Sequence, residues 1–197
     1  MVVAVPHALD VLAADHTHYR LSSRPQDSNG FEESVQKELG AARSDPYTTY
    51  YWNTAALMLE SAAEQLQRPA ELEQARKVLE EGLRHLPDDP TLVVSLSNVL
   101  ARSNRQSEAV ALLVPYLAVD KYQADGHYNL GLIYLSWNRP QEAVPYLEAA
   151  VRFNPQDADS HWYLGEAYRA LGRPADAQKE QETAASLNPE YRTGSAG

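Results

Sequence analysis

The chain contains no cysteine, so it offers neither a thiolate nucleophile nor a thiolate metal ligand, and histidines and carboxylates are the first candidates for chemistry. The tightest group is His16 and His18, with His7, Asp10 and Asp15 close by in sequence. Such a group could hold a metal ion. However, two histidines with one residue between them are common in polar segments, and short motifs of this kind match by chance often. We therefore expect no metal site and no resident cofactor.

Two further histidines recur at a fixed interval, His127 and His161, which are 34 residues apart. We expect them to lie at equivalent places on neighbouring helices and to serve as packing residues. The sequence has no glycine-rich phosphate loop, no nucleophile elbow and no His-Glu-x-x-His segment. Adjacent carboxylates such as Asp88 and Asp89 are interpreted as capping charges. The sequence thus predicts a protein that is not an enzyme.

Composition restricts the partners of the chain. A net charge of −10 disfavours nucleic acid and anionic lipid surfaces, and 44% hydrophobic residues allow a substantial core. The longest apolar run, 109–119, is interrupted by Pro115 and is far shorter than the roughly 20 residues of a membrane span. The first residues lack a basic region, so we expect no signal peptide and favour a cytoplasmic location over export, although a mature chain whose signal had been removed would look the same.

The elements that would position these side chains follow from an internal repeat. One set of seven residues is echoed 34 residues later: His127, Leu130, Gly131, Tyr134, Ala143, Leu147 and Pro155 return as His161, Leu164, Gly165, Tyr168, Ala177, Gln181 and Pro189. This period and order of residue types resemble the tetratricopeptide repeat, a helix-turn-helix unit. The resemblance implies an all-α, right-handed α-solenoid of helix-turn-helix repeats with an N-terminal helical extension.

The repeat phase suggests the domain organisation. The expected parts are a poorly defined segment and linker at 1–30, an amphipathic helix at 31–45, a repeat domain at 46–189 with units at about 46–87, 90–121, 124–155 and 158–189, and a flexible tail at 190–197. The first unit is divergent, and the helix that opens it is expected to begin at Pro46. Pro115 and Pro145 fall inside second helices and are expected to bend them.

Small residues explain how the two helices of a unit approach each other. Gly131 and Gly165 let the first helix lie close to the second, where a large side chain would push the pair apart. In the last unit Gln181 replaces the leucine found at this place in the other units, as at Leu147. A polar final helix can face water, so the last helix is expected to cap the array.

The resemblance also implies a binding surface, because in this family the first helices of the units line a concave groove. Aromatic anchors beside charged residues are typical of a peptide groove. The residues expected to line the groove are Asn98, Arg102, Tyr128, Asn129, Leu132, Trp162, Glu166 and Arg169. Arg102 and Arg169 are the only cations of this stripe and favour acidic or phosphorylated partner segments.

One known use of the family is disfavoured by the sequence. Co-chaperone members bind an acidic C-terminal carboxylate through lysine, arginine and asparagine side chains on successive units. Asn98 and Asn129 match the asparagines, but Val94, Asp159 and Tyr163 stand where the cations are required. A carboxylate clamp of that type is therefore not expected.

These inferences favour a non-catalytic protein-interaction module that binds a peptide or a partner helix. The alternative is a regulatory or assembly part of a larger enzyme whose catalytic domain lies elsewhere, since residues 1–45 are not explained by the repeats. The expected partner is a protein or peptide. The oligomeric state is left open, a monomer included.

Overall fold

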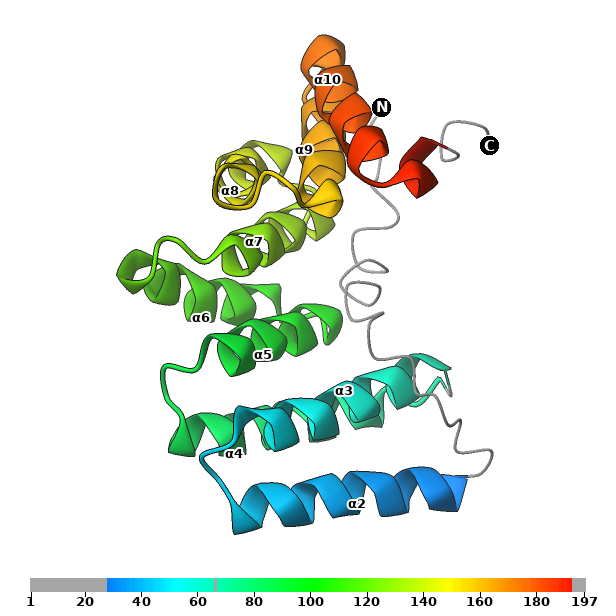
Figure 1. Ribbon diagram of the computed structural model, residues 1–197, viewed down its shortest axis with the longest axis vertical. Helices are drawn as coiled ribbons and strands as arrows, with labels where there is room; N and C mark the ends of the chain where they lie inside the picture. The colour runs from blue at the N-terminus through cyan, green and yellow to red at the C-terminus, as the bar shows by residue number, and fades with distance from the viewer. Residues whose placement is uncertain (1–27, 66, 193–197) are drawn as a thin grey trace. The chain divides into compact units, whose positions relative to one another are not determined.

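A computed structural model describes residues 28–65 and 67–192. All regular elements within these ranges are helical, which confirms the predicted all-α fold of helix-turn-helix repeats (Figure 1). The described residues divide into two compact units. Residues 28–112 form the N-terminal unit, and residues 113–192 form the C-terminal unit.

The N-terminal unit contains α2 (Ser28–Ser44), α3 (Thr49–Gln65), α4 (Ala70–His85), α5 (Pro90–Arg102) and the first half of α6 (Gln106–Val119). In this unit α2 packs on α3, α3 on α4 and α4 on α5, and α3 also contacts α5. The amphipathic helix predicted at 31–45 is present as α2, which begins earlier, at Ser28, and ends at Ser44; its apolar positions Phe31, Val35 and Leu39 are buried. Their spacing of four residues places them on one face of the helix, which packs against α3.

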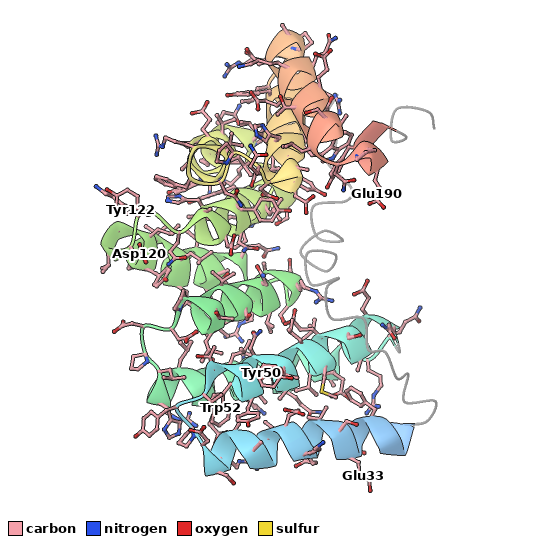
Figure 2. The ribbon with its side chains drawn as sticks, viewed as in Figure 1. Glu33, Tyr50, Trp52, Asp120, Tyr122 and Glu190 are labelled. Carbon is pink, nitrogen blue, oxygen red and sulfur yellow. The ribbon has the colours of Figure 1, made fainter. Side chains whose placement is uncertain are left out.

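The start of α3 differs from the prediction, which placed it at Pro46. Asp45 instead forms a turn, in which its backbone oxygen and its carboxylate both accept hydrogen bonds from Thr48, at 3.3 and 2.6 Å. The helix therefore begins at Thr49. Trp52 (labelled in Figure 2) is fully buried in this unit, and its indole N–H donates to the Pro46 oxygen at 3.0 Å.

The C-terminal unit consists of two helical pairs and a short final element. It contains the second half of α6, then α7 (Ala124–Ser136), α8 (Pro140–Phe153), α9 (Ala158–Ala170), α10 (Pro174–Leu187) and the 3-10 helix η1 (Pro189–Arg192). Within this unit α7 packs on α8, α8 on α9, and α9 on α10 (Figure 1). α7 also contacts α9 directly, so the first helices of the two pairs are neighbours.

Both pairs of the C-terminal unit turn through a residue with positive φ, which is 55° at Asn138 and 70° at Gly172. Glycine adopts this conformation without a steric penalty, and asparagine tolerates it better than most residues. Proline follows two residues later in each case, at the first position of the next helix, where its missing N–H costs nothing. These are the turns that the sequence predicts within the repeats.

The close approach of paired helices is visible at the two predicted glycines. A Cβ atom added at Gly131 would lie 2.5 Å from Cγ of Leu147, which is fully buried. At Gly165 the nearest atom would be Cγ of Gln181, at 2.8 Å. The pairs α7–α8 and α9–α10 are therefore packed backbone to side chain with no room for a methyl group.

The last helix has the polar character expected of a cap, since only Ala177 and Ala184 of α10 are buried. Gln181 is not simply solvated, however. Its amide donates to Glu166 at 2.6 Å and accepts from Arg169. The polar replacement thus keeps α10 attached to α9 through hydrogen bonds in place of an apolar contact.

Several sequence predictions concern residues outside the described ranges. They are the segment and linker over residues 1–27, which include the histidine group His7, His16 and His18, and the tail over 193–197. The tail prediction is wrong at its start, because residues 189–192 form η1 and do not begin a flexible tail.

The two glycines lead to a stability prediction. Gly131→Ala and Gly165→Ala gain the same helix propensity, so their difference isolates the packing cost. Gly131→Ala forces a methyl group to within 2.5 Å of the buried Leu147, where overpacking typically costs about 1–3 kcal/mol. At Gly165 the methyl group meets the partly exposed Gln181, which can shift, and the Ala177 backbone oxygen at 3.1 Å, so we expect a smaller cost there. Thermal unfolding followed by circular dichroism should give the lower melting temperature for Gly131→Ala. Equal melting temperatures would contradict this account of the pairing.

Candidate functional site

The eight predicted groove residues are divided between the two units. Asn98 and Arg102 lie on α5 in the N-terminal unit. The other six lie in the C-terminal unit: Tyr128, Asn129 and Leu132 on α7, and Trp162, Glu166 and Arg169 on α9. The structure therefore brings six of them onto two neighbouring helices, whereas the two on α5 belong to a different unit.

Arg102 is not the available cation that the sequence predicts. Its side chain is only 11% exposed, and its Nη1 atom donates to Oε2 of Glu60 at 2.8 Å, while Nη2 lies 3.6 Å from Glu64. Glu60 is itself buried, and burial raises its pKa from 4.5 to about 7 against the opposing attraction of Arg102. Arg102 therefore neutralises a buried carboxyl group within the N-terminal unit. This pairing corrects the expected role.

Two of the predicted anchors on α7 are core residues. Tyr128 is 3% exposed and Leu132 is fully buried. The Tyr128 ring lies edge-on to the Tyr163 ring of α9, with 6.1 Å between their centres. The sequence predicts a groove residue at Tyr128, where the structure has a packing contact with α9.

Trp162 has a partner that the sequence analysis missed. Tyr191 of η1 stacks on the indole ring at 4.9 Å between ring centres, with 27° between the planes. The phenol O–H donates to Oδ1 of Asp159 at 2.5 Å, and burial together with this hydrogen bond raises the pKa of Tyr191. The only signal in the sequence was an aromatic residue two positions after Pro189, in a segment assigned to the tail.

The second predicted cation is also engaged within the chain. Arg169 donates to Glu166 and to the side-chain oxygen of Gln181. Glu166 in turn accepts from the Gln181 amide at 2.6 Å. Since Arg102 and Arg169 both have carboxylate partners, the expected preference for acidic partner segments loses its basis.

The first turns of α7 and α9 each carry a carboxylate, Asp125 and Asp159 respectively. No cation of the described residues forms an ion pair with Asp125 or Asp159. Partial desolvation and the nearby charge of Asp157 raise the pKa of Asp125. The pKa of Asp159 is raised by desolvation in the first place, lowered by the Tyr191 hydrogen bond and raised by Asp157. Each of these two carboxylates is therefore repelled by Asp157 and has no cationic partner among the described residues.

A buried amide lies one helical turn after Asp125. The Nδ2 group of Asn129 donates to the Asp125 backbone oxygen at 2.8 Å, which holds the amide near the start of α7. Its Oδ1 atom is buried and has no hydrogen-bond partner among the described residues, and the side chain as a whole is 2% exposed. Buried polar atoms are rarely left unpaired, so this acceptor marks a place where a donor would be favourable.

The repeated histidines are packing residues, as predicted. His161 is buried, with Nδ1 2.7 Å from Oε2 of Glu180 and Nε2 3.2 Å from the Pro155 oxygen. His127 lies between the rings of Tyr146 and Phe153. Over 28–65 and 67–192 no cluster of three histidine or acidic side chains could hold a metal ion, and no helix there is long and apolar enough to cross a membrane.

Comparison with known proteins agrees with this architecture. A family profile described as tetratricopeptide repeat matches residues 96–157 and 128–191. The chain is a tetratricopeptide-repeat protein, with the matched repeats running from residue 96 to residue 191. A comparison with curated proteins found no match.

Similar solved structures share the fold at low sequence identity. A structure titled "MamA 41-end from Desulfovibrio magneticus RS-1" has a TM-score of 0.64 and 16% identity, covering 95% of this chain and 98% of that one. A structure titled "Crystal structure of MamA" has a TM-score of 0.63 and 17% identity, covering 82% of this chain and 91% of that one. At this identity the likeness concerns the fold alone.

The Glu60–Arg102 pair leads to a pH prediction. Between pH 4.5 and about 7 the folded chain keeps a proton on Glu60 that the unfolded chain has released, so stability falls as pH rises through this window. The full effect corresponds to about 3 kcal/mol, at about 1.4 kcal/mol per pH unit. Glu60→Gln should remove this fall, so its stability relative to the wild type should increase from pH 5 to pH 8.

The measurement is the free energy of unfolding in urea at pH 5 and at pH 8. Glu64→Gln is the matched control, because Glu64 is 57% exposed and lies near the same arginine. Glu64 makes the smallest contribution to the raised pKa of Glu60, so most of the pH dependence should remain in this control. A constant stability difference between Glu60→Gln and the wild type at all pH values would show that Glu60 is ionised throughout.

Proposed function

We propose that this protein is a non-catalytic interaction module whose C-terminal unit binds a short segment of a partner protein. The proposed site is the surface formed by Asp125, Asn129, Asp159 and Trp162, which we call the α7–α9 face. Tetratricopeptide repeats support a role in protein–protein interaction, because their stacked helices present extended surfaces. The α7–α9 face combines an aromatic plane with several hydrogen-bond acceptors, which suits a peptide.

One observation carries the proposal, namely that the α7–α9 face already receives a short segment of this chain. Residues 189–192 leave α10 and place Tyr191 against Trp162, with its hydroxyl group on Asp159. Aromatic stacking is worth about 0.5–1.5 kcal/mol beyond the buried area, and a hydrogen bond to a charged acceptor adds to it. A partner segment with the same features could use the same contacts.

The intramolecular contact between Tyr191 and Trp162 also affects the affinity for a partner. A partner that needs the face of Trp162 must displace Tyr191, and its apparent affinity is reduced by the fraction of molecules in which Tyr191 is bound. Removing Tyr191 should therefore strengthen binding, whereas removing Trp162 should weaken it. Opposite effects of two residues that contact each other are not expected from a purely structural role.

A non-catalytic role agrees with the surroundings of the titratable groups. Catalysis requires a convergent nucleophile, base and orienting group. The most enzyme-like pair in the described residues is His161 with Glu180, but both imidazole nitrogens face acceptors within the chain. His161 is also buried, which leaves no ring nitrogen directed to a substrate.

The test uses peptides selected by phage display on the full-length wild-type protein from a random library of twelve-residue peptides, then labelled for fluorescence anisotropy. We expect Trp162→Ala to weaken their binding at least about tenfold, as loss of an aromatic anchor typically does. Tyr191→Ala should strengthen binding. Gln141→Ala, an exposed position on α8, should have no effect and serves as the control.

Glu148 is a less suitable control although it is exposed, because its carboxylate accepts a hydrogen bond from Tyr168 at 2.6 Å. The melting temperature of each variant must be measured, so that unfolding is not taken for lost affinity. Failure to select any peptide, or selected peptides that are indifferent to Trp162→Ala, would refute the proposed function.

A further inference from the structure

We infer that the partner segment carries a lysine or arginine side chain that binds between Asp125, Asn129 and Asp159. The inference rests on the proposed function and specifies the chemistry of its partner. It also reverses the preference expected from the sequence, which pointed to acidic segments.

The first argument is that this part of the α7–α9 face offers acceptors. Asn129 has already used an amide hydrogen on the Asp125 backbone, and its buried Oδ1 atom is left over. Asp125 accepts no hydrogen bond from another side chain of the described residues, and Asp159 accepts from Tyr191 through Oδ1 only. A ligand must therefore supply donors, and an ammonium or guanidinium group supplies donors without any acceptor.

The second argument is electrostatic. Asp125 and Asp159 occupy equivalent positions 34 residues apart, and Asp157 acts on both. Asp157 caps α9 by accepting from the Ser160 backbone at 3.0 Å, so its position is fixed by the fold. The nearest cation on the same two helices, Arg169, is paired with Glu166. A partner cation would relieve a repulsion that no cation of residues 28–65 and 67–192 compensates.

The third argument concerns the burial of the Asn129 acceptor. A carboxylate cluster at helix starts can be explained by the favourable end of the helix dipole alone. The dipole does not explain the buried and unpaired Oδ1 atom of Asn129, whose Nδ2 group is held on the backbone oxygen of Asp125. A donor that reaches Oδ1 and the carboxylates together accounts for both observations.

The tryptophan beside one of the acidic positions favours the same ligand. Trp162 lies three residues after Asp159 on α9, whereas Tyr128, at the equivalent place on α7, is buried. Residues at this spacing are neighbours on one helix face. Cations bind favourably over tryptophan and tyrosine rings, and arginine does so most often. The net charge of −10 would in addition speed the approach of a basic segment at low ionic strength.

The test compares the composition and the charge dependence of the selected peptides. Peptides selected on the wild type should be enriched in lysine and arginine over the starting library. Asp125→Asn combined with Asp159→Asn should weaken their binding at least about tenfold and flatten its salt dependence. The matched control is Glu32→Gln with Glu33→Gln, which removes the same charge from exposed positions on α2, where Glu33 points away from the other helices (Figure 2).

A second arm tests whether the site sets the preference. Selection on Asp125→Lys with Asp159→Lys should enrich acidic peptides in place of basic ones. In a single representative basic peptide, replacement of its lysine or arginine by norleucine should cost the wild type as much affinity as the double Asn variant does. The two losses should not add when combined, because they remove the same contact.

The outcomes separate this inference from the proposed function. Peptides that lose affinity in Trp162→Ala but show no basic enrichment, or that tolerate the double Asn variant, overturn the inference and leave the proposed function in place. Equal losses in the double Asn variant and in the α2 control would show attraction to the overall negative charge and would also overturn it. Absence of any Trp162-dependent peptide overturns both.

Discussion

The contact on which the C-terminal unit depends is the close approach of two paired helices at a glycine. At Gly131 the backbone of α7 lies against the buried side chain of Leu147, in a space with no room for a Cβ atom. This contact fixes the rotation of α7 about its axis relative to α8. Because side chains follow the helix with 3.6 residues per turn, the same rotation decides that Asp125, Tyr128 and Asn129 lie on the side facing α9. A core constraint on one face of α7 thereby positions the candidate site on another.

The α9–α10 pair has the same close approach at a glycine as the α7–α8 pair, but the residue that contacts the glycine is polar. Gln181 stands where α8 has Leu147 and binds both Glu166 and Arg169. The polar cap therefore recruits the one arginine of α9 into a network with a carboxylate and an amide. Arg169 also pairs directly with Glu166 and lies ten residues after Asp159, so it does not compensate the acidic residues at the start of α9. The polar cap ends the array without supplying a cation to the α7–α9 face.

The repeat phase allowed much of the fold to be predicted from sequence. Gly131, Gly165, Asn138 and Gly172 carry steric requirements that few other residues satisfy, so their spacing indicated the helical pairs and turns directly. The same phase assigned Tyr128, Asn129 and Trp162 to neighbouring first helices. Periodicity identifies the face of a helix on which a residue lies. It does not reveal which side chain from elsewhere in the chain covers that face.

The errors at the candidate site have this origin. Arg102 is paired with Glu60, which lies 42 residues earlier, and Tyr191 reaches Asp159 across 32 residues. Neither distance is a multiple of the repeat, so no alignment of the units could suggest these pairs. The start of α3 was misplaced for a local reason: the helix was expected to begin at Pro46, but the Asp45 side chain closes a turn with Thr48, and the helix begins at Thr49.

A protein-interaction surface in such a fold can be made selective without any catalytic group. The helical pairs are closely packed at Gly131 and Gly165, which fixes the positions of the acceptors on the first helices in the folded chain, so binding need not order them. Tyr191 also contributes to selectivity, because it stacks on Trp162 and donates a hydrogen bond to one oxygen of Asp159 but supplies no positive charge. A partner segment with both an apolar group and a cation could stack on Trp162 as Tyr191 does and in addition form an ion pair with the carboxylates. Selectivity would then arise from the difference between the partner and the intramolecular ligand that it replaces.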